Sequence, residues 1–318
     1  MKTITGQSHG KLILIGEHSV VYQKPSIALP FRAATISVQL EPAGNHSYLF
    51  SDIYEGPTEE APNRLDALIG LFNILRHDFH LERTHFTIRV SSSLPIERGL
   101  GSSAALSVAF IRAFYQYLDR PLTTEDLLDY ADYAETISHG HPSGLDARVT
   151  ALNQPLLFQK GQHPTVFDFH TPYWLVVADS GIAGNTKSTV ERVKTAYDSP
   201  YPARKAAVHQ AIDGLGELTP RFAEALTASQ SSLEVLASII QSAQTYLQSL
   251  QVSSPELDFG IQEMLKHGAA AAKLTGGGGG GCYYGLVETH DQALALQEAL
   301  THSPYASDTW LMPLSSQY

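Results

Sequence analysis

A glycine and serine segment followed at once by a strongly apolar run constrains the fold of this chain more than any other feature. Gly99, Gly101, Ser102 and Ser103 directly precede AALSVAFIRAFYQYL, a run of helix formers so apolar that the helix must be buried. A helix start leaves about four backbone N–H groups without partners and carries a positive partial charge. Glycines just before such a start let an anion approach those donors closely, so the segment predicts a phosphate site.

The same segment has other interpretations. In the plainest one, Ser102 or Ser103 is an N-cap residue after a tight turn. A P-loop is excluded by spacing, because its nearest approach, residues 6–12, has one residue too few between the glycines and a leucine where the hydroxyl belongs. A Rossmann fingerprint beginning at Gly99 is disfavoured, because no acidic residue ends a strand about 20 residues downstream.

Length and composition restrict the number of domains, the cellular location and the kinds of partner that the chain can have. The chain has 318 residues, 43% of them hydrophobic, so we expect two domains, residues 1–180 and 181–318. Its apolar stretches fall short of the roughly 20 residues that a membrane span needs, and the N-terminus lacks a signal-peptide pattern. The single cysteine, Cys282, fits a reducing compartment, so a cytoplasmic location without membrane attachment is expected. The formal net charge of -11 argues against nucleic acid as a partner.

Hydrophobic patterns predict both strands and helices, with long helices after residue 180. Alternation and β-branched or aromatic content predict strands at 11–16, 34–41, 47–51, 84–91, 156–159, 166–169, 173–180, 282–288 and 308–314. Helical spacing of apolar residues predicts helices at 63–79, 104–118, 124–138, 186–197, 203–228, 232–250, 256–272 and 291–300. This mixture is typical of an α+β protein.

Three further stretches contain candidate functional residues. In KLTGGGGGGCYYGL, six consecutive glycines join a helix to an apolar strand, which favours a functional loop over a flexible linker. In HGHPSGLDARVTAL, Asp146 stands at an expected helix start, where it could also be an ordinary first-turn residue. In GKLILIGEHSVVY, Lys11 begins a strand, and Glu17 with His18 follows the glycine at its end.

Taken in order, GKLILIGEHSVVY, LPIERGLGSSAA, HGHPSGLDA and KLTGGGGGGC resemble the motifs of the GHMP kinases, across residues 10–282. The GEHSVVY and HGHPSGLD segments are most similar to the mevalonate kinases of that family. The resemblance implies a two-domain α+β GHMP kinase fold. Its N-terminal domain would be like the second domain of ribosomal protein S5, and its C-terminal domain would be ferredoxin-like.

The resemblance also implies roles for individual residues. Asp146 matches the catalytic aspartate, and Lys11 matches a lysine that contacts the transferred phosphate. Ser103 and Glu135 match ligands of Mg²⁺. The substrate-binding residues implied are Glu17, His18 and Asp146. The nucleotide contacts implied are Ser92, Glu97, Arg98, Gly99, Leu100, Gly101, Ser102 and Ser103, and the glycine-rich third motif is Gly276, Gly277, Gly278, Gly279, Gly280 and Gly281.

Two departures from the family pattern stand out. Glu97 and Arg98 occupy positions where many relatives have Gly-Ala or Gly-Gly, which predicts a less open entry to the phosphate loop. Gly277 replaces the usual alanine of the third motif, a change that costs chain entropy but should keep phosphate access.

The resemblance therefore implies transfer of the ATP γ-phosphate to the 5-hydroxyl of mevalonate, with Mg²⁺ as cofactor. A homodimer is also implied, since family members are often dimers. The alternatives are a kinase for phosphomevalonate, homoserine or a sugar, and a sensor that binds a nucleotide or metabolite without catalysis. Retention of Asp146, Lys11 and Glu135 argues against the sensor.

Overall fold

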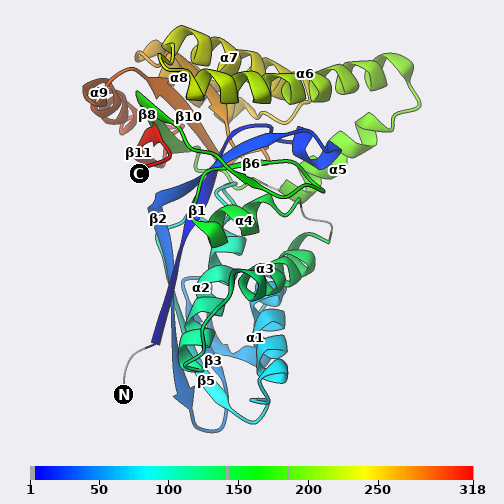
Figure 1. Cartoon of the computed structure of the whole chain (residues 1–318), viewed down its shortest axis with the longest axis vertical. Coiled ribbons are helices and arrows are strands. Elements are labelled where there is room, and N and C mark those ends of the chain that lie inside the picture. Colours follow the sequence, from blue (N-terminus) through cyan, green and yellow to red (C-terminus); the bar gives the residue numbers. More distant parts are fainter. Residues whose placement is uncertain (1–3, 141–142, 185, 318) are drawn as a thin grey trace. The chain divides into compact units, whose positions relative to one another are not determined.

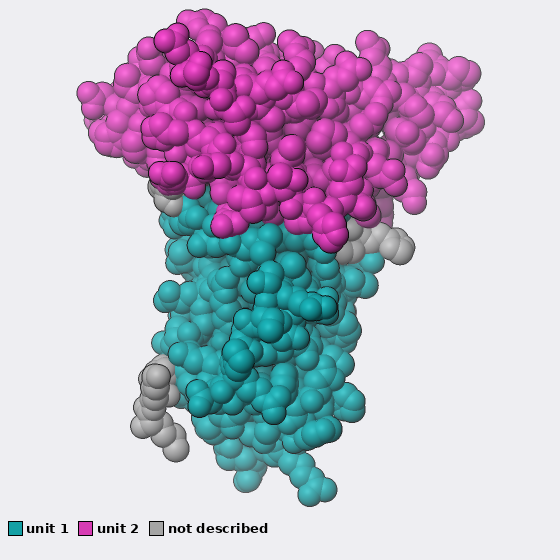
Figure 2. Space-filling model, in the orientation of Figure 1, with its two compact units in different colours: residues 1–11, 30–95, 101–153 teal, residues 12–29, 96–100, 154–318 magenta. Residues whose placement is uncertain are grey.

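The chain folds into two compact units, which Figure 2 colours separately. The computed structural model describes residues 4–140, 143–184 and 186–317. Unit 1 comprises residues 1–11, 30–95 and 101–153, and unit 2 comprises residues 12–29, 96–100 and 154–318. Each unit is assembled from segments far apart in the sequence, and the expected division near residue 180 stays a prediction.

Unit 1 contains a mixed sheet with helices on one side of its strands (Figure 1). β5 runs antiparallel to β2 and parallel to β3. Phe86 and Ile88 alternate with more exposed residues along β5, so its apolar side chains point to the helices. The strands are hydrogen-bonded in the order β4 (Tyr54–Pro57), β3 (Tyr48–Ser51), β5 (His85–Ser92) and β2 (Ser26–Ala43), and β1 (Ile4–Ile15) pairs with β2.

The helices of unit 1 pack around α2, as the apolar sequence of that helix predicts. Phe110 of α2 meets the ring of Phe72 edge-on, with ring centroids 6.1 Å apart. The ring of Phe114 is tilted by 49° to that of Phe86, with centroids 5.9 Å apart. Each such buried side chain contributes about 1.5–3 kcal/mol, so these contacts fix the helix and thereby its first residues. The helices are α1 (Asp66–Asp78), α2 (Ser102–Tyr117), α3 (Thr124–His139) and α4 (Leu145–Leu152), with short 3₁₀ turns η2 (Thr58–Glu60) and η3 (Asn63–Leu65).

Unit 2 contains an antiparallel sheet of four strands. Tyr283 and Tyr284 of the inner strand β10 are fully buried. Separately, the first residues of β2 pair with β6 (Leu156–Phe158), which pairs with β7 (Thr165–Val166). The strand order in the antiparallel sheet is β11 (Asp308–Ser315), β8 (His170–Asp179), β10 (Cys282–Val287) and β9 (Ala271–Leu274).

The helices of unit 2 are amphipathic and bury one face each. In α7, for example, Leu236, Ile240 and Leu247 recur at helical spacing and are buried. Within the described ranges, no helix is long and apolar enough to cross a membrane. The helical segments are η1 (Ser19–Tyr22), α5 (Thr186–Tyr197), α6 (Pro202–Thr227), α7 (Leu233–Ser249), α8 (Pro255–Lys266) and α9 (His290–Leu300).

The expected helix over residues 256–272 is wrong in its last part. Helix α8 ends at Lys266, and Gly268 follows with φ +99°, a conformation that stops the helix. The alanines of β9 then pair with β10, with Ala272 opposite Gly285. Alanine favours helices, so strand pairing in the folded unit overrides the local preference here. Strand β4 is absent from the expectation because it is short, whereas the helix start expected at Asp146 is confirmed by α4.

Candidate active site

The backbone N–H groups at the start of α2 have no side-chain cap among the described residues, as the glycine and serine segment predicts. Its N-cap residue is Gly101, with φ +73°, and no described side chain makes a capping hydrogen bond there. The alternative in which Ser102 or Ser103 is the N-cap residue is therefore wrong. A Cβ at position 101 would lie 2.8 Å from Cγ of Lys11, so only glycine fits this approach.

Lys11 and Asp146 meet beside this helix start, within unit 1. The Nζ atom of Lys11 lies 3.2 Å from a carboxylate oxygen of Asp146. The Lys11 side chain is 3% exposed but that of Asp146 is 31% exposed, so the carboxylate is the member of the pair that a ligand can reach. The other oxygen, Oδ2, would lie 3.6 Å from a Cβ at Gly101. The structure thus brings two predicted residues and the predicted anion site together.

Helix α4 holds Asp146 in its first turn. The helix starts after Gly144, whose φ is +84°. Arg148, two residues after Asp146, donates through both terminal nitrogens to the carboxylate of Asp132 in α3, at 2.8 and 2.9 Å. This forked pair fastens α4 to α3 and so fixes the direction of Asp146. Sequence reasoning missed this pair, because Arg148 lies just beyond the HGHPSGLDA motif and Asp132 stands 16 residues before it in another helix. His141 and Pro142 of the same motif lie outside the described residues.

Glu135 of α3 is a buried carboxyl group near the same pair. It is 4% exposed. Burial is the largest cause that raises its pKa to about 8, and the charge of Asp146 adds to the effect, while Lys11 opposes it. Near neutral pH the carboxyl therefore holds a proton in the unliganded protein, which a bound cation would displace.

Ser103 lies in the first turn of α2 and contacts α3. Its hydroxyl is 3.1 Å from the hydroxyl of Ser138. Ser138 follows Glu135 by three residues and therefore shares its helix face. The described residues include no group of three or more His, Cys, Asp or Glu side chains that could hold a metal by themselves. Ser103 and Glu135 would therefore need oxygen atoms of a ligand and of water to complete a metal site.

The remaining residues predicted to contact nucleotide lie before α2. Ser92 ends β5, and its hydroxyl accepts from the backbone N–H of Leu94 at 3.0 Å, so it shapes the turn. Leu100 is fully buried. Arg98 forms an ion pair with Asp179 at 2.9 Å. The Glu97 carbonyl accepts from the N–H of Gly184 at 2.8 Å. The loop entry is thus held in unit 2 by polar contacts.

The six-glycine run is a packed loop, so the flexible-linker alternative is wrong. Of its residues, only Gly279 is not buried. A Cβ at Gly276 would lie 2.8 Å from Cα of Gly99, one at Gly278 would lie 2.1 Å from the carbonyl oxygen of Val252, and one at Gly280 would lie 2.7 Å from that of Ile182. Backbone therefore passes backbone at distances that exclude side chains. The contact with Gly99 joins the third motif to the phosphate loop within unit 2.

His18 faces the glycine run. Its Nε2 atom is 3.0 Å from the carbonyl oxygen of Gly277 and therefore carries a proton and donates it. Burial is the main cause that lowers the pKa of His18 to about 4, so the ring is neutral at physiological pH. The residue has φ +61° and ψ −45°, a sparsely populated conformation with positive φ. Such a conformation costs about 1–3 kcal/mol for a non-glycine residue and is found at functional sites.

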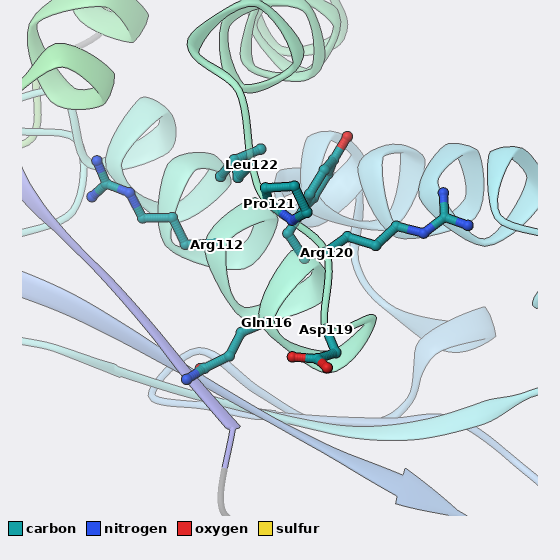
Figure 3. Close-up of a pocket in the computed structure, with 7 residues that line it drawn as sticks. Arg112, Gln116, Asp119, Arg120, Pro121 and Leu122 are labelled. Carbon is teal, nitrogen blue, oxygen red and sulfur yellow. The ribbon is translucent and has the colours of Figure 1, made fainter.

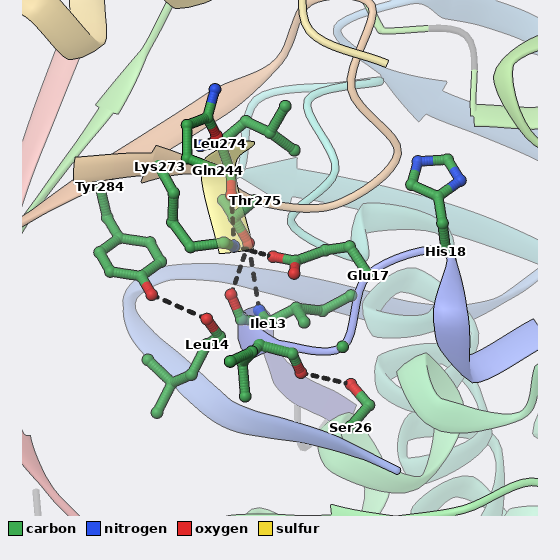
Figure 4. Close-up of polar contacts among 12 residues, drawn as sticks. Ile13, Leu14, Glu17, His18, Ser26, Gln244, Lys273, Leu274, Thr275 and Tyr284 are labelled. Carbon is green, nitrogen blue, oxygen red and sulfur yellow. Dashed lines mark hydrogen bonds and ion pairs between the residues drawn. The ribbon is translucent and has the colours of Figure 1, made fainter. Parts of the chain in front are cut away.

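Glu17, next to His18, is buried in an ion pair. Its side chain is 0% exposed and accepts from Nζ of Lys273, as the dashed line in Figure 4 marks. Lys273 is a residue that sequence reasoning missed, since a lysine in a strand usually lies at an exposed edge. Its position two residues before the TGGGGGG segment is the one signal that could have indicated it.

Two surface hollows lie apart from these residues. One, of about 460 Å³, is lined in part by Arg112, Gln116 and Arg120 (Figure 3). Arg112 and Arg120 point to opposite sides of it in that view, and Arg112 donates to the carbonyl oxygens of Gln7 and Ala151. The other, of about 520 Å³, lies among residues of α5, α6 and the end of α7. Neither contains a predicted site residue.

Comparison with known proteins matches both halves of the chain to one family. Models of the N-terminal and C-terminal domains of GHMP kinases match residues 67–154 and 203–306. A mevalonate kinase of Aeropyrum pernix is 31% identical over 309 residues, which cover 93% of this chain and 92% of that protein. The chain belongs to the GHMP kinase family.

Solved structures of GHMP kinases extend the match to the whole fold. A mevalonate kinase from methicillin-resistant Staphylococcus aureus MRSA252 has a TM-score of 0.73 and 31% identity, covering 99% of this chain and 100% of that one. The mevalonate kinase of L. major in complex with R-mevalonate has a TM-score of 0.80 at 24% identity, covering 98% of this chain and 96% of that one. The predicted two-domain GHMP kinase fold is confirmed.

One departure of this GHMP kinase from the family pattern has a visible reason. A Cβ at Gly277, where relatives usually have alanine, would lie 2.5 Å from Oγ1 and 2.8 Å from Cβ of Thr186. Gly277 is not among the glycines with positive φ, so its backbone would tolerate alanine. The side chain of Thr186 at the start of α5 therefore takes the space that the methyl group would need.

Proposed function

We propose that this GHMP kinase is a mevalonate kinase, which transfers the γ-phosphoryl group of ATP to the 5-hydroxyl of mevalonate. The observation that carries the proposal is the contact of Lys11 with Asp146 beside the open start of α2. The names of the relatives supply the acceptor. The mevalonate pathway of isoprenoid biosynthesis is the corresponding biological setting.

The ATP phosphates would lie against the first turn of α2. The unpaired N–H groups of that turn and the helix dipole favour negative charge there. Gly99 and Gly101 keep the approach free of side chains, and Ser102 and Ser103 add hydroxyl donors. Phosphoryl transfer needs mainly positioning and positive charge around the phosphates, and both are supplied by this arrangement.

Magnesium fits the residues at this place. A buried carboxyl whose pKa is raised to about 8, largely by burial, is a group that a cation would bring to its ionised form. Ser103 and Glu135 would hold the ion, and phosphate oxygens and water would complete its shell. When bound, Mg²⁺ neutralises charge on the phosphates. Glu135 of α3 and Ser103 of α2 would orient the ion.

Asp146 would accept the proton of the acceptor hydroxyl. As the hydroxyl oxygen bonds to the γ-phosphorus, the bond from that phosphorus to the bridging oxygen of ATP breaks and ADP leaves. General-base help of this kind contributes about 10²–10⁴ fold. The Nζ atom of Lys11 lies 3.2 Å from the Asp146 carboxylate and would place a positive charge next to the reacting oxygens. For His18 and Glu17, the motif that they share with GHMP kinases supports a role in recognising the acceptor.

An acceptor panel tests this function. Mevalonate, phosphomevalonate, homoserine and galactose are offered with ATP and Mg²⁺, and ADP release is measured by a coupled assay. We expect kcat/KM for mevalonate to exceed that of the others by about a hundredfold or more, because buried polar contacts discriminate strongly. A higher value for another acceptor would assign the chain to that kinase activity. If none of the four acceptors gives ADP release, the result would support the sensor that binds a nucleotide or metabolite without catalysis.

We also propose a cytoplasmic location and a homodimer. Cys282 is the one cysteine of the sequence and is buried, which supports a reducing compartment. Cell fractionation tests the location, and light scattering of the purified chain tests the dimer.

A further inference from the structure

A fully buried ion pair connects two segments of the kinase site that are remote in the sequence. Glu17 is separated from the end of β1 by Gly16 alone, and Lys273 lies in β9, 256 residues later. Both side chains are 0% exposed. The Nζ atom of Lys273 also donates to the carbonyl oxygen of Leu274 at 2.6 Å and lies 5.3 Å from the ring centroid of Tyr284. Figure 4 shows these groups converging within unit 2.

Neutral hydrogen bonds join the same two segments beside the pair. The hydroxyl of Thr275 donates to the carbonyl oxygen of Ile13 at 3.0 Å and accepts from the N–H of Ile13 at 3.2 Å. The hydroxyl of Tyr284 donates to the carbonyl oxygen of Leu14 at 2.7 Å. The end of β1 is therefore already fastened to β9 and β10, and cohesion of the strands does not depend on charge.

Each member of the pair lies just before a segment with candidate functional residues. Glu17 is followed by His18, whose backbone with positive φ turns its ring to Gly277. Lys273 is followed, after Leu274 and Thr275, by the glycine run. The pair thus fixes two backbone segments. The residue after Glu17, His18, contacts Gly277, which lies four residues after Lys273. A shift of either segment would alter the hydrogen bond between Nε2 of His18 and the Gly277 carbonyl.

Energetics favour a positioning role over a purely stabilising one. Removing two opposite charges from water costs about as much as their attraction returns, so a buried pair often stabilises no more than apolar residues of equal volume. Its directional contact can, however, specify one arrangement of the groups that it joins. A strained residue such as His18 persists only where the surrounding structure holds it in place, and the adjacent ion pair can supply that constraint.

We propose that Glu17 and Lys273 are positioning residues that set His18 and the glycine loop for the acceptor alcohol. Glu17 then acts through Lys273 rather than by touching the acceptor. This inference rests on the proposed function and extends it to a fully buried pair that would not contact the acceptor.

Three variants test the pair in the full-length protein. Glu17→Asp keeps both charges but shortens the carboxylate by one methylene, and the double variant Glu17→Gln/Lys273→Met removes both charges with little change of volume. Lys266→Met is the matched control, since it removes a 69% exposed lysine that pairs with Glu263 at 3.4 Å. Thermal unfolding and steady-state kinetics with mevalonate and MgATP are measured for each.

We expect both pair variants to raise the KM for mevalonate about tenfold or more, because small displacements at a site are costly. The KM for MgATP should change less than about twofold, and Tm should stay close to wild type in the double variant. Lys266→Met should match wild type throughout. An unchanged KM for mevalonate in the folded Glu17→Asp protein would overturn the proposal, as would equal increases of both KM values.

The ring of His18 gives a readout that does not depend on the acceptor. In protein labelled with ¹⁵N-histidine, with the signal assigned through His18→Asn, wild type should show the tautomer protonated at Nε2. The pair variants should shift that signal, and Lys266→Met should not. If wild type does not phosphorylate mevalonate, the proposed function is wrong, yet a shifted signal still supports the positioning pair. A His18 signal identical in all variants would show that the pair does not position it.

Discussion

Asp146 is the single residue on which the proposed reaction depends most. We expect Asp146→Asn to lower kcat by about 10² fold or more, because the amide cannot accept the acceptor proton. ATP affinity should be nearly unchanged, since we propose that the phosphates bind at the first turn of α2. Kinetics and calorimetric titration with ATP measure both quantities. The control is Asp213→Asn, which alters an exposed pair with Lys24 at 2.7 Å. Full activity of the Asp146 variant would remove the residue from the mechanism.

Glu135 is expected to bind Mg²⁺ through its carboxylate. Glu135→Gln should raise the Mg²⁺ concentration needed for half-maximal activity several-fold and leave Tm nearly unchanged. The amide resembles the protonated carboxyl that predominates near neutral pH, because burial raises its pKa to about 8. An activity titration with Mg²⁺ measures this, and Glu125→Gln, at an exposed position of the same helix, is the control. An identical titration in both variants would exclude Glu135 as a ligand.

At the scale of elements, the glycine loop between β9 and β10 is held by backbone contacts. Gly278→Ala should destabilise the protein by about 2 kcal/mol or more and lower activity, because φ is +70° and the new Cβ would meet the carbonyl oxygen of Val252 at 2.1 Å. Gly161→Ala is the control, since φ there is +86° but no atom lies within 4 Å of the added Cβ. It should cost about 1 kcal/mol without affecting kinetics.

Chemical denaturation at equilibrium measures the two free energies of unfolding. Equal losses in Gly278→Ala and Gly161→Ala would contradict the close backbone packing of the loop.

The stability of the whole molecule should depend on pH through His18. Burial lowers its pKa to about 4 from the ordinary value of 6.5, so the unfolded chain binds the proton more readily between these values. The stabilising contribution of the neutral ring is complete above about pH 6.5 and is lost as pH falls toward 4. Relative to His18→Gln, wild type should lose about 3 kcal/mol more between about pH 7 and pH 4.

Urea unfolding at several pH values measures this dependence. His18→Gln keeps a donor for the Gly277 carbonyl but does not titrate, so parallel pH profiles of the two proteins would contradict a buried neutral His18.

Much of the site could be predicted from the sequence because its parts are local. The glycines before α2 and the position of Asp146 in the first turn of α4 follow from short segments whose chemistry does not need the rest of the chain. Arg148 with Asp132 and Thr186 beside Gly277 could not be predicted in this way. Those pairs join different elements, and no spacing in the sequence indicates such contacts.

By itself, the sequence predicted a phosphate-binding helix start and a functional glycine loop, because backbone donors and steric limits act within a few residues. Its motifs, compared with those of the GHMP kinases, indicated which residues would carry out a kinase reaction. Only the tertiary structure decided that alanines 271 and 272 form a strand, that Glu17 pairs with Lys273, and that Lys11 reaches Asp146. Strand pairing and the burial of charges depend on which distant segments meet, and local preference is too weak to fix that.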